Sequence, residues 1–314
     1  MKASYFGFVA VLALGAAACS SSSSNPPAGV TVEQACTDWA TKYCGKLNDC
    51  APLVLTLSYG SAAACQEAIK PNCLTALADP NVNLTPTIAS TCAAGIGTMA
   101  CSDLGTSNTG CPATPGKVAE AGACGDNAEC QSNLCDIVSG TSCGKCSKPK
   151  GAGDDCTANG KCSEGYACAA GKCAKPGATG ATCGDAAPCG FGLVCAAGKC
   201  AVGGKLGEAC SGDGKTDPPC NSLAGLWCNP VAKKCEAIKV AALATACGID
   251  MKTYTITTCD ATGWCDTAGS STGAGTCKAK AKEGEACGDK AASCVAPLNC
   301  EAGKCAKFNP TACK

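Results

Sequence analysis

Cysteine is the residue that most constrains what this chain can fold into, because it occupies 35 of 314 positions. That frequency, about 11%, is above the level typical of disulfide scaffolds. Aromatic residues make up only 4% of the chain, and alanine and glycine bury little area. A core worth roughly 25 cal/mol per Å² is therefore out of reach over most of the sequence. We expect a small disulfide-rich fold whose order comes from covalent links.

Two absences exclude whole classes of chemistry. The chain has no His and no Arg, so all 25 basic residues are Lys. Without His there is no Ser-His-Asp triad and no imidazole metal ligand, and without Arg there is no bidentate fork for phosphate or guanine. The formal net charge is zero, so no excess of basic residues favours nucleic acid. We expect no catalytic residues, no cofactor, no metal site and no nucleic-acid partner.

Residues 1–18 have the pattern of an export signal, with one Lys followed by roughly fourteen apolar residues, too few for a spanning helix. Segment 16–19, Ala-Ala-Ala-Cys, resembles a bacterial lipobox, in which the cysteine becomes the lipidated first residue, although Ala16 stands where Leu is usual. Ordinary cleavage after residue 18 is the alternative. Lipidation of Cys19 leaves 34 cysteines, an even number that allows 17 disulfides.

Residues 19–29 then form the lipidated cysteine and a Ser/Pro-rich tether that reaches roughly 15–20 Å if it is flexible. Ser20, and not Asp, follows the cysteine. In lipoproteins of two-membrane bacteria, this resemblance implies transfer to the outer membrane. We therefore expect an exported protein whose membrane partner is reached through a lipid on Cys19. A secreted protein is the alternative.

Residues 30–112 are predicted to form an all-α domain stapled by its cysteines. Thr31 and Gln34 fit a capping box that opens a first helix. A second helix is expected over 61–70, with Pro71 ending or restarting it. Thr85 and a following Pro begin a third. Each helix points cysteine at a shared interior. The eight cysteines are Cys36, Cys44, Cys50, Cys65, Cys73, Cys92, Cys101 and Cys111.

Residues 113–314 repeat a four-cysteine unit six times and end in a short tail. The modules are 124–146, 156–173, 183–200, 210–235, 247–277 and 287–305. Units of about 18–30 residues cannot bury a core, so disulfides worth roughly 3 kcal/mol each must hold them. The Gly-Lys pair before the fourth cysteine is interpreted as a tight turn. Each module is therefore predicted to be a four-Cys knot that ends in a β-hairpin.

Four cysteines allow three pairings, and we favour first-to-third with second-to-fourth. An apolar residue stands one or two places before the third cysteine of every module. We expect it to fill the space beside the crossed disulfides. Cys143 and Cys313 are left over. They can pair with each other, but because 170 residues separate them we do not expect that bond.

Module one, CGDNAECQSNLCDIVSGTSCGKC, resembles the N-terminal cysteine-rich domain of the Dickkopf family of secreted signalling antagonists. The later modules echo it more weakly. The resemblance implies a small extracellular disulfide knot and suggests protein binding, without implying Wnt antagonism. The whole arrangement also resembles cysteine-rich lipoproteins of myxobacteria, which implies location and architecture and leaves the biochemical role open.

Candidate binding residues are few. Trp227 and Trp264 occupy the apolar position of modules four and five. Plugs of the disulfide core are one interpretation, and partly exposed stacking surfaces for a glycan or protein partner are the other. The C-x-x-C at 143–146 is expected to be structural and not a redox motif. Segment 213–217 is expected to be a solvated turn and not a calcium loop.

These features lead to two hypotheses of function. The first is a non-enzymatic cell-surface lipoprotein whose modules form an extended structural or adhesive array that binds extracellular protein or polysaccharide. The alternative is a secreted disulfide-rich protease inhibitor, in which one inter-cysteine loop protrudes while staying rigid. Loops 211–219, 248–258 and 266–276 are the candidates for that role.

Overall fold

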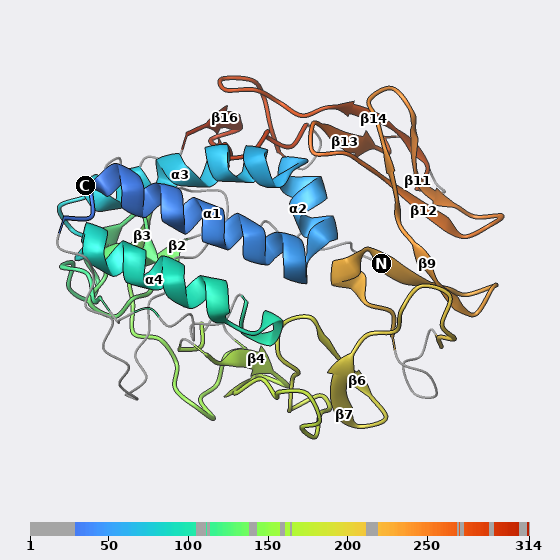
Figure 1. Cartoon of the computed structure of the whole chain (residues 1–314), viewed down its shortest axis with the longest axis horizontal. Coiled ribbons are helices and arrows are strands. Elements are labelled where there is room, and N and C mark those ends of the chain that lie inside the picture. The colour runs from blue at the N-terminus through green and yellow to red at the C-terminus, as the bar shows by residue number, and fades with distance from the viewer. Residues whose placement is uncertain are drawn as a thin grey trace.

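The chain folds into a helical region followed by small antiparallel strand pairs (Figure 1), and the described residues form 17 disulfides. The computed structural model describes residues 29–104, 111, 114–137, 143–157, 161–163, 165–211, 219–268, 270, 273–288, 292–307 and 313. The predicted export signal, Cys19 and the tether up to residue 28 lie outside these residues. Among the described helices, none combines the length and the apolar character that crossing a bilayer requires.

Four helices form the N-terminal region. They are α1 (Val32–Cys50), α2 (Pro52–Tyr59), α3 (Ala62–Ala78) and α4 (Pro86–Thr98). The caps predicted at Thr31 and Thr85 are confirmed, because each hydroxyl accepts a hydrogen bond from the N–H three residues on. α2 was not predicted. α3 corrects the expectation at Pro71, because the helix continues through this exposed proline.

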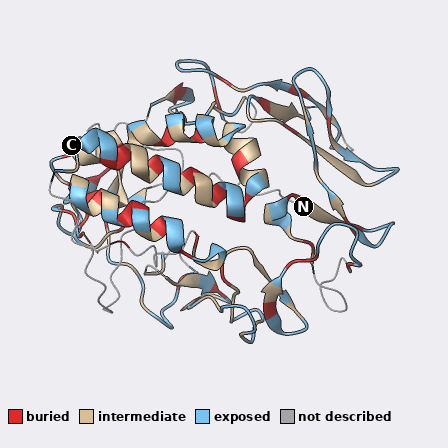
Figure 2. Cartoon of the chain, viewed as in Figure 1, coloured by how far each residue is buried: buried red, intermediate tan, exposed pale blue. Residues whose placement is uncertain are grey.

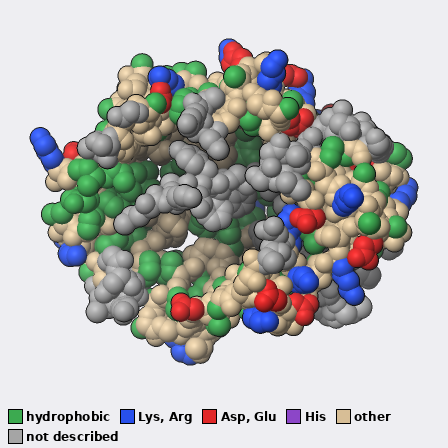
Figure 3. Space-filling model, turned by 180° about the vertical axis from the view of Figure 1, so that it is seen from behind, with side chains coloured by type: hydrophobic (Ala, Val, Ile, Leu, Met, Phe, Trp, Pro, Cys, Tyr) green, Lys and Arg blue, Asp and Glu red, His purple; other side chains and the backbone are tan. Residues whose placement is uncertain are grey.

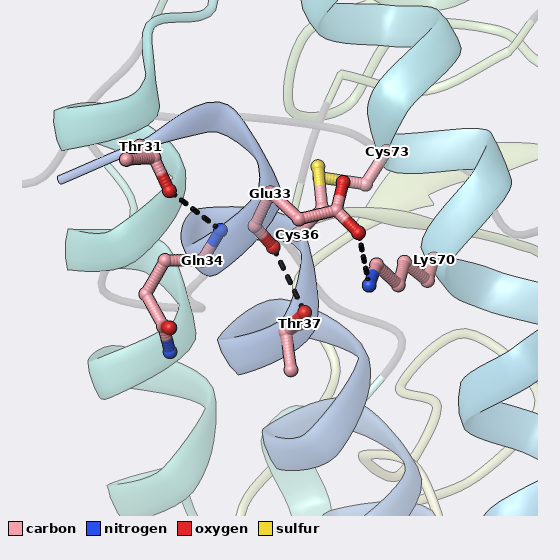
Figure 4. A network of polar contacts seen from close by, with 7 residues as sticks. All are labelled: Thr31, Glu33, Gln34, Cys36, Thr37, Lys70 and Cys73. Carbon is pink, nitrogen blue, oxygen red and sulfur yellow. Dashed lines mark hydrogen bonds and ion pairs between the residues drawn. A yellow bond between two sulfur atoms is a disulfide. The ribbon is translucent and has the colours of Figure 1, made fainter.

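α1 packs between α3 and α4, and buried residues follow its inner face, as Figure 2 shows. Disulfides Cys36–Cys73 and Cys44–Cys65 join α1 to α3. Cys50–Cys101 joins the last residue of α1 to the turn after α4, and Cys92–Cys111 ties the middle of α4 to the segment before module one. Figure 4 shows the disulfide Cys36–Cys73, which joins the start of α1 to α3. Beside it, the Glu33 carboxylate forms an ion pair with Lys70 Nζ at 2.5 Å. The predicted cysteine-lined interior is confirmed.

Each module contains a hairpin crossed by two disulfides. The paired strands are β2 (Cys135–Ile137) and β3 (Gly144–Cys146), β4 (Ala167–Ala169) and β5 (Lys172–Ala174), β6 (Leu193–Ala196) and β7 (Lys199–Val202), β8 (Leu226–Asn229) and β9 (Lys234–Ala237), β13 (Gly263–Asp266) and β14 (Gly275–Ala279), β15 (Asn299–Glu301) and β16 (Lys304–Ala306). In all six, the third and fourth cysteines lie opposite each other across the hairpin. They therefore share a face, on which they bond to the first and second cysteines. The favoured pairing is confirmed in every module.

The tight turn of modules two, three and six is Ala-Gly and not Gly-Lys. In module two, Ala170 and Gly171 have φ values of 47° and 78°. Two consecutive positive values are typical of the type I′ turn that suits a two-residue hairpin. Lys172 is then the first residue of β5. The predicted hairpin is confirmed, and its turn moves by one residue.

Module five lengthens this plan into a five-stranded sheet of order β10-β12-β11-β14-β13. The added strands are β10 (Lys239–Ala241), β11 (Ala246–Asp250) and β12 (Thr255–Cys259). In the other modules the incoming segment makes a single parallel bridge to the second cysteine. Here β10 makes three such pairs with β12. In module one, β1 (Ala123–Cys124) adds a third strand beside β3.

The array wraps around the helices, so the extended shape predicted from the repeats is wrong (Figure 1). Cys143 bonds to Cys313, a bond that we did not expect, and this joins module one to the C-terminal tail. Module three docks through Phe191, whose N–H donates to the Ser102 carbonyl at 3.2 Å. Next to module five, Lys280 Nζ donates at 3.3 Å to the carbonyl of Leu57, one of the last in α2. Helix geometry leaves such carbonyls without an internal partner.

Candidate binding surface

Large aliphatic side chains are exposed mainly on modules four and five and on the segment that joins them. Of the eight large hydrophobic residues exposed in the described part of the chain, five lie between residues 231 and 251. They are Val231, Val240, Leu243, Ile249 and Met251. Single exposed apolar residues are ordinary, but a group marks an interaction surface. Figure 3, seen from behind, shows hydrophobic side chains gathered at the end of the molecule where these modules lie.

The register of the sheet places part of this group on one face. Ile249 of β11 lies directly opposite Ile256 of β12. Val240 of β10 pairs with Thr258, two residues along β12 from Ile256. Because side chains alternate along a strand, Val240, Ile256 and Ile249 face the same side. The other side carries Ala241 and Cys259, which belong to the disulfide cluster of module five.

Val231 and Met251 lie in two hairpin turns of the same construction. In the first, the side-chain oxygen of Asn229 accepts from the N–H groups of Val231 and Ala232. In the second, Asp250 Oδ1 accepts from the N–H of Lys252 at 2.9 Å. Each turn closes with an N–H bonded back to the carbonyl of its first residue. The side chain of the first residue thus organises each turn, as Asx residues commonly do.

The buried side chain of Asn229 also ties the two turns together. Its Nδ2 donates to the Thr253 carbonyl in the second turn at 3.0 Å. Val231 is 67% exposed and Met251 51% exposed, although their turns are fixed to each other. We define the aliphatic strip as Val231, Val240, Ile249, Met251 and Ile256.

Lysines surround the aliphatic strip. Lys233, Lys234, Lys239 and Lys252 are exposed, and none forms an ion pair among the described residues. The two carboxylates between residues 231 and 252, those of Glu236 and Asp250, both accept hydrogen bonds. Hydrogen bonds from the Lys252 N–H and the Thr253 hydroxyl lower the pKa of Asp250. Glu236 accepts from Asn229 Nδ2 at 2.9 Å. Within residues 231–252 the four lysines outnumber these two carboxylates, so the segment that carries the apolar residues has a net positive charge.

Trp227 and Trp264 lie in these modules but do not plug the disulfides. Each directly precedes a cysteine that packs on the disulfide cluster, and successive strand residues face opposite sides. In module four the plug is Leu226. Both indoles are half-buried, and Trp227 Nε1 is buried with no hydrogen-bond partner among the described residues. The plug interpretation is wrong for both, while a role in partner binding stays a prediction.

The cysteine sulfurs of the modules lie as close together as the ligands of a metal site, but they are not free thiolates. In several modules three cysteine sulfurs lie within 4.8 Å of one another. All of these sulfurs are in disulfides, whereas zinc binds the free thiolate. Cys143 and Cys146 of the C-x-x-C bond to Cys313 and Cys130, not to each other. The segment 213–217 lies outside the described residues.

Sequence reasoning missed a group of buried carboxylates where module one docks on the helical region. Glu129 is 1% exposed, and its Oε2 accepts from the N–H groups of Gly125 and Asp126 at 2.5 and 3.2 Å. Burial, together with the charges of Glu129 and Asp79, raises the pKa of Asp126 to about 6. The D-x-x-E pattern signals a capping box. The burial of this capping box depends on contacts with residues 79–83 of the helical region, and no local sequence pattern indicates those contacts.

Comparison with protein-family models, curated proteins and solved structures finds no match to this chain. Function must therefore be inferred from the surface and the disulfide architecture. Extensive disulfide bonding is typical of extracellular or exported proteins. The perturbed carboxylates Asp155, Asp250 and Asp266 accept hydrogen bonds at turns. Such turns indicate structural roles for these carboxylates.

Proposed function

We propose that this protein is a non-enzymatic lipoprotein of the cell exterior, held at the outer membrane by a lipid on Cys19, and that it binds its partner through the aliphatic strip. The observation that carries the proposal is an exposed apolar surface on a covalently fixed scaffold. A group of aliphatic side chains in water is unfavourable unless something covers it.

The rigidity of the surface supports a binding role. Disulfides Cys247–Cys265 and Cys259–Cys277 close module five beneath the strip. Asn229 fixes the turn of module four to that of module five. A surface that is already ordered loses less conformational entropy when it binds, so more of the contact energy appears as affinity. Trp227 and Trp264 are available in the same two modules as further contacts.

The position of the strip fits an anchored protein. In Figure 1, α1 begins at the end of the molecule where the C-terminus lies, and β11 and β12 lie at the other end of the long axis. A lipid on Cys19 holds the first of these ends near the membrane. Modules four and five then face away from the anchor, where a partner can reach them. The likeness of module one to the Dickkopf cysteine-rich domain supports the proposal only through its disulfide spacing.

The proposal is tested with the full chain carrying Cys19→Ser, which cannot be acylated. We expect the labelled protein to bind intact cells and isolated envelopes saturably, and Ile249→Asp to weaken that binding at least tenfold. Leu206→Asp is the matched control, because Leu206 is exposed on a linker outside the strip. Mass spectrometry of the unmutated protein should find acyl chains on Cys19. Equal binding by the Ile249→Asp variant contradicts the proposal.

The alternative of a protease inhibitor has less support. Loop 248–258 is the β11–β12 hairpin, whose two strands pair with each other, and β10 pairs with Thr257 and Thr258 on the outer edge of β12. A protease cleft pairs with a substrate mimic through free backbone groups of an extended strand. Most of loop 211–219 and part of 266–276 lie outside the described residues. We expect no inhibition across serine, cysteine and metalloproteases, and stoichiometric inhibition of any of them would favour the alternative.

A further inference from the structure

We infer that the aliphatic strip binds an anionic lipid surface that faces the membrane holding the Cys19 anchor, with Val231 and Met251 inserted at the interface and the neighbouring lysines on the headgroups. This inference rests on the proposed function and names the partner of the same surface. Three observations support it: the shape of the surface, its residue composition and the hydrogen bonding of its backbone.

The shape favours a lipid surface because the apolar side chains stand on projecting turns. Val231 and Met251 lie in turns that connect paired strands, and each is more than half exposed. A protein partner must offer a concave surface of matching shape, as packing at interface cores requires. A bilayer interface is fluid and accommodates a projecting apolar residue of any outline.

The composition favours lipid over protein for a second reason. Cores of protein interfaces are enriched in aromatic residues and Arg and depleted in Lys. The strip is aliphatic apart from Met251, and Lys is the only cation near it because the chain has no Arg. A lysine can lay its alkyl stem along apolar surface while its ammonium reaches a phosphate. Each lysine close to an anionic membrane strengthens binding about fivefold.

The backbone of the two turns is already prepared for a dry environment. The N–H groups of Val231, Ala232 and Lys252 are bonded to the side chains of Asn229 and Asp250. The Thr253 carbonyl accepts from Asn229 Nδ2. Backbone groups without partners make entry into lipid costly. These four backbone groups therefore keep their hydrogen-bond partners when the turns leave water.

The experiment uses the full chain with Cys19→Ser and vesicles of phosphatidylcholine, alone or mixed in equal parts with phosphatidylglycerol. We expect sedimentation with the mixed vesicles, at least tenfold weaker binding to phosphatidylcholine alone, and weakening by salt. Lys233→Ala with Lys252→Ala should weaken binding about 25-fold, two fivefold steps. Val231→Asp with Met251→Asp should weaken it by at least as much.

The matched control is Val202→Asp with Leu206→Asp, which changes two equally exposed aliphatic residues outside the strip. It should bind like the parent, and every variant should show the same number of free thiols. Equal loss in this control, or no binding to the mixed vesicles, overturns the inference. If Ile249-dependent binding to envelopes survives extraction of their lipid, the proposed function stands and the partner is a protein or polysaccharide.

Discussion

The helical region and the modules differ in what lies at their centres. The larger helical cluster combines cysteines with residues such as Leu47, Ile69 and Ile96. The fully buried residues of the module clusters are cysteines, joined in module six by one alanine. Figure 2 shows the same contrast, with buried residues along the helices and mostly exposed or intermediate residues in the hairpins.

This difference shows that disulfides play different structural roles in the helical region and in the modules. Between α1 and α3, a disulfide locks a contact that packed side chains already define. In a module, the two disulfides are themselves the core, because there is little else to bury. The array also uses the helical core, since Phe191 and Leu223 pack against it. The modules thus depend on the helices more than the helices depend on the modules.

The strongest test removes one disulfide from each region. Cys44→Ala with Cys65→Ala opens a separation of 21 residues, and Cys189→Ala with Cys200→Ala opens one of 11. The chain-entropy term is about 3 kcal/mol in both cases. We expect the helical variant to keep protected amides at a lower melting temperature, whereas module three loses protection throughout β6 and β7. Hydrogen exchange with mass spectrometry measures both.

The two variants serve as controls for each other, because each deletes the two sulfurs of one disulfide and adds no polar group. Protected amides that persist in β6 and β7 contradict the comparison. That result would mean that docking on the helical region, and not the disulfide, orders the module.

The sequence predicted what depends on local spacing. The cysteine pattern within each module predicted both its hairpin and its pairing, because the third and fourth cysteines must share a face. Thr31 and Thr85 predicted two helix starts for the same local reason. Cys143–Cys313 was missed because that bond depends on how the whole array returns to module one. Local patterns carry no signal for such a closure.

Other misses came from burial, which a single sequence does not reveal. Pro71 is exposed, and so is Glu67, whose carbonyl the proline leaves without a donor; water can satisfy it. Val240 and Ile249 have the β-branched side chains of a buried strand, so no local pattern indicates that they form a surface. The orientation of Trp227 was predictable, because a residue next to a strand cysteine faces the other side.

A second test compares carboxylates by their response to pH. The folded state raises the pKa of Asp126 to about 6 from 3.8, so it holds a proton that the unfolded chain releases. This group therefore contributes most to stability below about pH 4, and the contribution is lost as pH rises to about 6. We expect Asp126→Asn to raise stability at pH 7 by about 3 kcal/mol and little at pH 4. Chemical denaturation at both pH values measures this.

The turn carboxylates of the modules provide the opposite case. Hydrogen bonds lower the pKa of Asp250, chiefly from the Lys252 N–H, and that of Asp266, chiefly from Lys278. Their stabilisation is present above the ordinary carboxyl pKa and is lost on acidification below it. Asp250→Asn should therefore change stability near neutral pH in the destabilising direction. An Asp126→Asn variant with the pH profile of the parent would contradict the assignment.

The prediction with the smallest expected effect replaces one glycine by alanine in each region. We expect this substitution to stabilise the protein in the helical region and to destabilise it in the modules. Gly45 lies inside α1 with open space around its Cβ position, so Gly45→Ala should stabilise the protein by about 1 kcal/mol. Gly207 precedes module four with φ +79°, and its N–H bonds to the Cys235 carbonyl. Gly207→Ala should cost about 1 kcal/mol, because a side chain disfavours that conformation.

The chain itself shows that alanine is tolerated at this turn position. Ala121 and Ala244 stand at the corresponding places before modules one and five, with φ of 67° and 63°, and each N–H bonds to the carbonyl of its module's fourth cysteine. The disulfides of these two modules thus hold an alanine in a strained conformation with positive φ. No residue of the described helices has to adopt such a conformation. Ala244→Gly should relieve that strain, less the entropy that glycine adds to the unfolded chain. Calorimetry showing stabilisation by both Gly45→Ala and Gly207→Ala would mean that helix propensity, and not turn geometry, governs the two sites.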